Sequence, residues 1–419
     1  MALTTVLDNG VRIITETMPE VRSVSLGVWV NVGSRHDPSD CAGIAHFTEH
    51  MLFKGTKQRS ALQIAKEIDA LGGVLNAQTS KEYTVYYTRV LDESLDKAAD
   101  VLFDLFLNSV IDADELDKEK KVVLQEIRMT EDTPDDYITD LFAEDFFRES
   151  SLGVPILGTL DSVGSFKREN VADFLSSFYS SSSIVISAVG NMEHDKIVSL
   201  ATSRFKDLKS SAKKQDKNDS LPALNGKTRV YDRDIEQVHI TLGTKGSSMK
   251  DEARWSYIVL NTILGGSMSS MLFQEAREKL GLVYSIYSYL NSYSDCGALA
   301  VYAATTPNYV KQTIEVVSEQ LSKLKKGDFG GISLADVKTQ IKGNLLLSRE
   351  NTVNRMSSLA KNEIYYGRHV PVEEVIERIE AVQTDDVVKL SDEIFQESKM
   401  TLVTLGRLDE EGVGGLVLP

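Results

Sequence analysis

The chain has 419 residues, of which 42% are hydrophobic and 26% are charged, and its formal net charge is −16. This length and composition are typical of a globular protein with two or three domains. The negative charge argues against nucleic acid as a partner, and no apolar run approaches the roughly 20 residues that a membrane helix needs. We therefore expect neither a nucleic-acid-binding nor a membrane-spanning protein.

The N-terminal ten residues lack the basic region and long apolar core of a signal peptide, and they lack the Arg-rich character of a transit peptide. The two cysteines, Cys41 and Cys296, are far apart in the sequence and suit a reducing compartment without a disulfide framework. We therefore predict a cytoplasmic protein. A mature chain in the mitochondrial matrix is the alternative.

The first predicted elements are two strands followed by a helix. An Asn-Gly turn at 9–10 precedes a strand that reaches residue 16, and 24–32 alternates as a second strand that ends at Gly33. The stretch Pro-Ser-Asp at 38–40 supplies N-cap candidates for the helix, and Gly55 supplies a stop signal.

This helix has two chemically different sides at the roughly 100° turn per residue of an α-helix. Its apolar side can pack on a core and consists of Ile44, Phe47 and Met51. Its polar side presents His46 and His50 one turn apart, with Glu49 beside them. Two His at this spacing can bind one Zn²⁺ while a Glu that is not a ligand accepts a proton, and the order His-x-x-Glu-His is an inverted zinc-peptidase motif. The pattern predicts a zinc site, whereas two solvated His on a wet helix face are the alternative.

Helices and strands continue to alternate beyond this motif. A helix over 62–71 ends at Gly-Gly, and paired strands follow over 74–79 and 83–90. Further helices are predicted over 95–107, 114–129 and 136–147, with a strand over 184–189. The mixture is typical of an α+β protein.

A polar, apolar-poor segment begins at Lys209 and is followed by Pro222, which is typical of a linker. Strand patterns of the first half recur after it at offsets of 214 and 216 residues, as in 24–28 and 238–242. We predict a catalytic half at 1–208, a linker at 209–226 and a homologous half at 227–419. Each half is expected to be an α/β sandwich in which helices cover a mostly antiparallel sheet.

The repeat also predicts which half carries the chemistry. At an offset near 215, His46 corresponds to Asn261 and His50 corresponds to Gly265. Neither can replace a zinc-binding imidazole, so the second half is predicted to keep the fold without the metal.

A zinc hydrolase usually has three protein ligands and an open fourth position. The helix predicted over 114–129 offers Glu119 and Glu126, which are seven residues apart and share a face. Periodicity alone does not choose between them, and both can be solvated surface charges. Cys41 lies just before the His helix, where a third ligand would strain the geometry.

The residues described so far carry a resemblance to the pitrilysin family of zinc metallopeptidases, in the branch of mitochondrial processing peptidase and its bacterial relatives. The match spans nearly the whole chain. It includes the His-x-x-Glu-His helix with Phe-Lys-Gly-Thr at 53–56, the segment 75–80 with 82–87, and a Glu that follows His50 by 76 residues.

The resemblance implies that His46, His50 and Glu126 bind zinc and that Glu49 is the general base. Glu119 would then support the site by contacting a ligand. Asn76 and Ala77 would lie on an edge strand that takes the substrate in extended form, because such an edge offers unpaired backbone groups to any peptide. 

Other implied site residues lie outside the ligand helices. Arg277 and Tyr284 would donate to the substrate backbone and to the developing oxyanion. Glu144 and Glu149 correspond loosely to acids that hold an Arg near the cleaved bond in processing peptidases. Unaided by the resemblance, Arg277 is a surface residue of an amphipathic helix.

We therefore predict a zinc-dependent endopeptidase that cleaves extended peptides or presequence-like segments, including basic ones, in a chamber between two halves. A relative of this length usually forms a homodimer, and a heterodimer is the alternative. The main rival function is a non-catalytic or half-active scaffold subunit of a heteromeric complex. Such subunits lose motif residues, whereas His46, Glu49, His50 and Glu126 are all present here.

Overall fold

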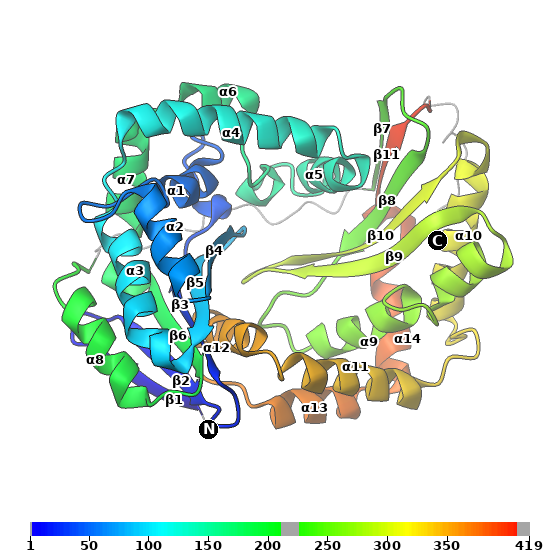
Figure 1. The fold of residues 1–419 in the computed structure, drawn as a ribbon. Helices are drawn as coiled ribbons and strands as arrows, with labels where there is room; N and C mark the ends of the chain where they lie inside the picture. The colour runs from blue at the N-terminus through cyan, green and yellow to red at the C-terminus, as the bar shows by residue number, and fades with distance from the viewer. Residues whose placement is uncertain (1, 211–225, 409–419) are drawn as a thin grey trace. The chain divides into compact units, whose positions relative to one another are not determined.

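The computed structural model describes residues 2–210 and 226–408, which form two compact units (Figure 1). Within the described residues, unit 1 consists of 2–129, 154–210 and 347–370, and unit 2 consists of the remainder. The predicted linker at 209–226 lies outside the described residues apart from its ends.

Unit 1 contains a six-stranded sheet in the order β1-β2-β6-β3-β5-β4. Its strands are β1 (Ala2–Val6), β2 (Arg12–Thr17), β3 (Ser23–Val30), β4 (Val74–Thr79), β5 (Thr84–Leu91) and β6 (Ile184–Gly190). The pair β2 and β6 is parallel, and the other pairs of this sheet are antiparallel. Its helices are α1 (Ile44–Leu52), α2 (Ala61–Ala70), α3 (Leu95–Asn108), α4 (Ala113–Glu131, whose last turn begins unit 2), α6 (Leu160–Ser165), α7 (Arg168–Phe178), α8 (His194–Phe205) and α12 (Thr352–Tyr366).

Unit 2 repeats this arrangement with a five-stranded sheet in the order β7-β11-β8-β10-β9. Its strands are β7 (Lys227–Asp232), β8 (Val238–Lys245), β9 (Val283–Ser292), β10 (Gly297–Thr305) and β11 (Thr401–Gly406). Its helices are α5 (Pro134–Phe146), α9 (Arg254–Leu264), the π-helical turn η5 (Phe273–Lys279), α10 (Val310–Lys325), α11 (Leu334–Ser348), α13 (Val372–Ala381) and α14 (Thr384–Ile394). The order matches β2-β6-β3-β5-β4, including the single parallel pair, so the predicted fold class of two similar α+β halves is confirmed.

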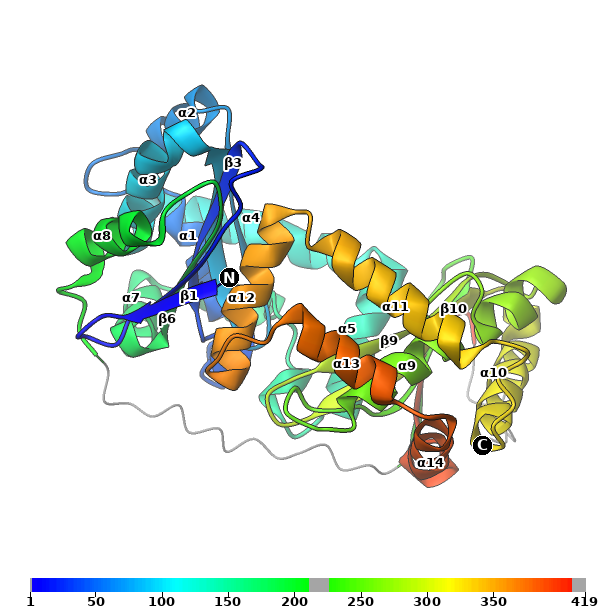
Figure 2. The same ribbon diagram turned by 90° about the horizontal axis from the view of Figure 1, so that it is seen from below.

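Each sheet also receives a helix from the other half of the sequence. In unit 1, α12 packs on β6, β3 and β2 (Figure 2), and in unit 2, α5 packs on β11 and β8. Both faces of each sheet are apolar, and burying the second face stabilises the unit. The compact units therefore differ from the sequence halves 1–208 and 227–419 by two exchanged segments, 130–153 and 347–370.

Ion-paired hydrogen bonds connect α12, and the turn before it, to the sheet of unit 1. The buried carboxylate of Glu16 on β2 accepts two hydrogen bonds from Arg355, at 2.8 and 2.7 Å, and a third from Arg349 at 3.4 Å. Beneath these charges, Met356 and Leu359 pack against Trp29 in an apolar cluster. Because a bidentate guanidinium–carboxylate pair is geometrically specific, this contact also fixes where α12 lies on the sheet.

We expect Arg355→Met to lower the free energy of unfolding of unit 1 by about 1–3 kcal/mol, because Glu16 loses charge-assisted hydrogen bonds at a buried position. The control is Arg22→Met, since the Arg22 side chain is 72% exposed in its pair with Asp92. Such an exposed pair is screened by water and contributes little to stability. Calorimetric unfolding of both variants measures the two losses in unfolding free energy. Equal losses would contradict a stabilising role for the contact between Arg355 and Glu16.

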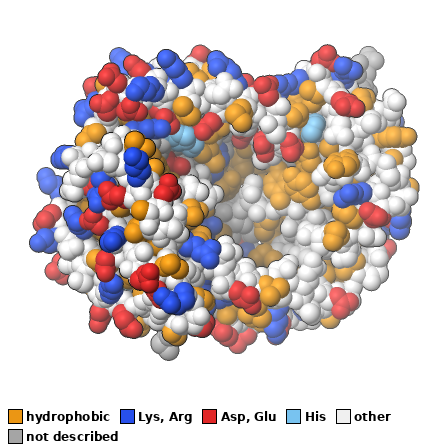
Figure 3. All heavy atoms as spheres, in the orientation of Figure 1, with side chains coloured by type: hydrophobic (Ala, Val, Ile, Leu, Met, Phe, Trp, Pro, Cys, Tyr) orange, Lys and Arg blue, Asp and Glu red, His pale blue; other side chains and the backbone are white. Residues whose placement is uncertain are grey.

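The surface carries charges of both signs. Figure 3 shows Lys and Arg side chains interspersed with Asp and Glu side chains over the visible face. The acidic net charge is therefore not gathered into one patch on this face. Among residues 2–210 and 226–408, no helix is both long enough and apolar enough to cross a bilayer.

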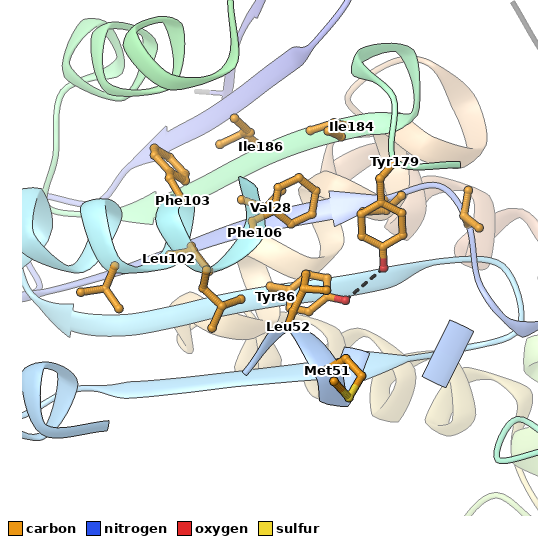
Figure 4. Packing of buried hydrophobic residues seen from close by; sticks show 14 of the residues in the cluster. Val28, Met51, Leu52, Tyr86, Leu102, Phe103, Phe106, Tyr179, Ile184 and Ile186 are labelled. Atoms are coloured by element: carbon orange, nitrogen blue, oxygen red, sulfur yellow. Dashed lines mark hydrogen bonds between the residues drawn. The ribbon is translucent and has the colours of Figure 1, made fainter. Parts of the chain in front are cut away.

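A continuous apolar core lies between the sheet of unit 1 and the helices that include α1 and α3. Val28, Phe106 and Ile186 meet in this core, and Leu52 and Met51 extend it to α1 (Figure 4). The buried hydroxyl groups of Tyr86 and Tyr179 satisfy each other at 3.0 Å (Figure 4). Packing on this core therefore fixes the position of α1 relative to the sheet.

Candidate metal centre

The entry into α1 differs from the predicted cap at 38–40. The helix begins after Gly43, whose φ of 89° favours glycine, and a Cβ there would lie 2.5 Å from the carbonyl oxygen of Leu157. The carboxylate of Asp37 accepts hydrogen bonds from the backbone N–H groups of Gly43 at 2.7 Å and Ala45 at 3.1 Å. The predicted cap is wrong because Asp37 folds back from the preceding turn, and the helix ends at Leu52 rather than at Gly55.

The predicted two sides of α1 are confirmed. Ile44, Phe47 and Met51 are at most 1% exposed, and the Phe47 ring packs edge-on against Phe166 at 5.3 Å. His46, Glu49 and His50 are half-buried on the opposite side. The two imidazole rings lie side by side, with centroids 4.5 Å apart.

Helix α4 brings Glu126 to these imidazoles. Its Oε2 lies 4.0 Å from Nε2 of His46 and 3.6 Å from Nε2 of His50. One ligand atom from each residue lies within 4.8 Å of the others, and this is the one such group of three or more His, Cys, Asp or Glu found in the described chain. Cys41 does not join it, since its thiol is buried beside Asn170.

Glu119 occupies a different place, although it shares a face of α4 with Glu126. Its Oε1 lies 2.7 Å from Nδ1 of His50, and its Oε2 lies 2.5 Å from the ammonium group of Lys54. Glu119 is 4% exposed, so its buried negative charge needs both His50 and Lys54 as compensating partners. By accepting a hydrogen bond from Nδ1–H, Glu119 leaves Nε2 of His50 free to bind a metal.

Burial and the neighbouring charge of His50 lower the pKa of His46 to about 3. His46 is therefore neutral near pH 7, as a metal ligand must be. At His50, burial lowers the pKa, but the hydrogen bond to Glu119 and the charges of Glu126 and Glu119 outweigh it and raise the pKa overall. Burial also disfavours the charged form of Glu119, yet its hydrogen bonds to His50 and Lys54 lower its pKa.

The carboxylate of Glu49 faces the same site without joining the three ligand atoms. Its Oε2 accepts a hydrogen bond from the hydroxyl of Thr79, the last residue of β4. Burial raises the pKa of Glu49, although the hydrogen bond from Thr79 and the charge of His50 oppose this shift. A half-buried carboxylate with a raised pKa is suited to accept and return a proton near neutral pH.

The strand β4 is an edge of the sheet, since β5 is its one neighbour in the strand order. Asn76 and Ala77 lie in its middle and pair with Tyr87 and Tyr86 of β5. Their other backbone edge faces away from the sheet. This is the arrangement that an extended peptide can join as a further strand.

The remaining predicted site residues lie in unit 2. Arg277, on η5, stacks over the ring of Phe273 at 4.7 Å and lies 5.8 Å from the ring centroid of Tyr284. Tyr284 is 76% exposed at the start of β9, an edge strand. Glu144 and Glu149 are exposed at the end of α5 and just beyond it.

The donor set of His46, His50 and Glu126 fits a catalytic zinc ion. Two imidazole nitrogens and one carboxylate oxygen are ligands that Zn²⁺ prefers, and a catalytic site keeps one further position open. The Nδ1 atom of His50 has Glu119 as its partner, whereas the buried Nδ1 atom of His46 has no hydrogen-bond partner among the described residues.

Sequence reasoning assigned no role to Lys54 or Thr79. Lys54 follows His50 by four residues, a spacing that places it beside the same end of the helix. Thr79 alternates with Ala77 and Leu75 on β4 and therefore shares their face. Both signals are in the sequence, but only the folded chain shows which carboxylate each side chain meets.

The fold and the donor set define a class of protein, a duplicated α+β chain in which two His and one Glu could hold a metal ion, as in zinc hydrolases. Residues 12–160 match the family model described as Insulinase (Peptidase family M16), and residues 165–342 match the model described as Peptidase M16 inactive domain. The second description agrees with the absence of equivalent ligands at Asn261 and Gly265.

Relatives match over almost the full length. The chain is 42% identical to the uncharacterized zinc protease YmxG of Bacillus subtilis, over 93% of this chain and 94% of that protein. It is 38% identical to an uncharacterized zinc protease of Rickettsia felis, over 97% of this chain and 98% of that protein. The chain therefore belongs to peptidase family M16, which confirms the predicted metallopeptidase family and zinc as its cofactor.

Solved structures share the fold. The crystal structure of a protease from Helicobacter pylori superimposes with a TM-score of 0.90 and 23% identity, covering 97% of this chain and 99% of that chain. A structure titled as the peptidase M16 inactive domain from Pseudomonas fluorescens has a TM-score of 0.88 and 19% identity, covering 97% and 98%.

Proposed function

We propose that this chain is a zinc-dependent endopeptidase that cleaves extended peptide segments, presequence-like segments included, with Glu49 as its general base. The observation that carries the proposal is the meeting of His46, His50 and Glu126 beside Glu49. Zinc held by these three ligands would polarise the scissile carbonyl and lower the pKa of the attacking water. Glu49 accepts a proton from that water and delivers it to the leaving amine.

The edge strand β4 supplies the binding part of this function. A peptide that pairs with Asn76 and Ala77 uses backbone hydrogen bonds, so its affinity depends little on side chains. Pairing also holds the peptide extended beside α1, since α1 packs against β4. The proposed substrates are therefore unfolded or extended peptides rather than compact proteins.

Other predicted features stay predictions of this proposal. A preference for basic peptides is supported by the net charge of −16 and by the exposed acids Glu144 and Glu149. We still propose Arg277 and Tyr284 as hydrogen-bond donors to the substrate. A homodimer is still the proposed assembly. The proposal favours an enzyme over the rival scaffold function because His46, His50 and Glu126 form one compact group that could hold a metal, with Glu49 beside it.

The test is cleavage of an unstructured peptide by the purified chain. We expect cleavage that a chelator abolishes and that added zinc restores, and we expect a peptide with Arg near the cleaved bond to be cut faster than its neutral version at low salt. Cleavage that persists in Glu49→Gln at the wild-type rate would reveal a contaminating protease. Cleavage that appears only with a second, different subunit would support a half-active subunit instead.

A further inference from the structure

We propose that Thr79 is a positioning residue for Glu49. Its hydroxyl donates a hydrogen bond to Oε2 of Glu49 and thereby presents Oε1 as the oxygen that accepts the proton of the attacking water. This inference rests on the proposed function, because it assigns Glu49 the role of general base. It adds a residue whose side chain acts on the base and on none of the metal ligands.

The contact is well placed for that role. Thr79 is 9% exposed and ends β4 on the same strand face as Ala77, toward α1. Within residues 2–210 and 226–408, the Glu49 side chain takes part in no other hydrogen bond. The orientation of the carboxylate therefore depends on one donor.

The turn that follows Thr79 is held by several hydrogen bonds. The chain turns after Thr79, and the two ends of this turn are joined by a hydrogen bond from the backbone N–H of Ser80 to the carbonyl of Tyr83 at 2.8 Å. Within the turn, the Glu82 carboxylate accepts a hydrogen bond from Arg35 at 2.8 Å, and both side chains are 2% exposed. A buried, charge-assisted contact of this kind holds the turn, and with it the Thr79 hydroxyl, in one place.

Orientation matters because a general base acts only within hydrogen-bond reach of the proton that it takes. A displacement of about 1 Å at a catalytic group can cost about 10²-fold in rate. Thr79 also belongs to the strand that we propose to pair with the peptide, so one rigid strand would align both the base and the substrate. The simpler alternative is that Glu49 only satisfies the buried hydroxyl of Thr79.

Three variants separate these readings. Thr79→Val keeps the branched shape and removes the hydroxyl, whereas Thr79→Ser keeps the hydroxyl. The control is Thr88→Val on the neighbouring strand β5, because the buried Thr88 hydroxyl has no hydrogen-bond partner among the described residues. Its loss leaves no polar partner unsatisfied.

For Thr79→Val we expect kcat to fall about 10–100-fold with little change in KM and with full zinc content, since only the placement of the base changes. Thr79→Ser is expected to recover most of the rate, and Thr88→Val to match the wild type. In crystal structures of the zinc-loaded proteins, Glu49 should adopt more than one orientation in Thr79→Val and a single one in Thr79→Ser.

The proposal is overturned if Thr79→Val turns over like the wild type, if it loses zinc, if Thr79→Ser fails to recover the rate, or if Glu49 keeps its single orientation without the hydroxyl. A wild-type protein that binds zinc but cleaves no peptide would instead contradict the proposed function. In that case the orientation of Glu49 in the two crystal structures still decides whether Thr79 positions it.

Discussion

His50→Ala is expected to leave the purified protein with little or no bound zinc. The variant removes one of three ligands, and His46 and Glu126 alone offer an incomplete set for Zn²⁺. The loss in affinity should exceed the roughly 10–100-fold that follows when only a hydrogen-bond partner of a ligand is changed. Metal analysis after dialysis and chelator competition measure both quantities.

Two comparisons sharpen this measurement. Glu119→Gln keeps a hydrogen-bond acceptor for Nδ1 of His50 and should weaken zinc binding by about 10–100-fold. His194→Ala removes a His that hydrogen-bonds Thr5 and Thr15, away from the ligand atoms, and should retain zinc. Wild-type zinc content in His50→Ala would refute the site.

Glu49→Gln is expected to keep one zinc per chain and to lose turnover by about 10²–10⁴-fold, because an amide cannot accept the proton of water. The matched change Glu126→Gln has the same chemistry but should release zinc, since it removes an anionic ligand. Metal content and rate, measured on the same preparations, separate the two roles. If Glu49→Gln lost zinc while Glu126→Gln kept it, Glu49 would be the ligand and Glu126 the general base.

Local patterns in the sequence predicted the elements that carry the site. The period of α1 separated the buried Phe47 from His46 and His50, and the structure confirms both sides. The recurrence of strand patterns predicted two similar sheets, which the matching strand orders confirm. These features could be predicted from short stretches of sequence, because the direction of each side chain along one helix or strand follows from its backbone period.

The start of α1 shows where local reasoning fails. Residues 38–40 have the composition of a cap, yet Asp37 caps the helix from across a turn. The exchange of α5 and α12 between the units was likewise missed, because it depends on which distant apolar surfaces meet. Neither contact has a signature within a short window of sequence.

The sequence by itself determined the chemistry of this protein: two imidazoles one turn apart, a carboxylate between them and two further acids on one helix face. Only the tertiary structure decided that Glu126 meets the imidazoles while Glu119 meets Nδ1 of His50 and Lys54. It also decided that Thr79 meets Glu49. Helical periodicity places Glu119 and Glu126 on the same face, so they are distinguished only by where α4 packs along α1, and that is a property of the whole fold.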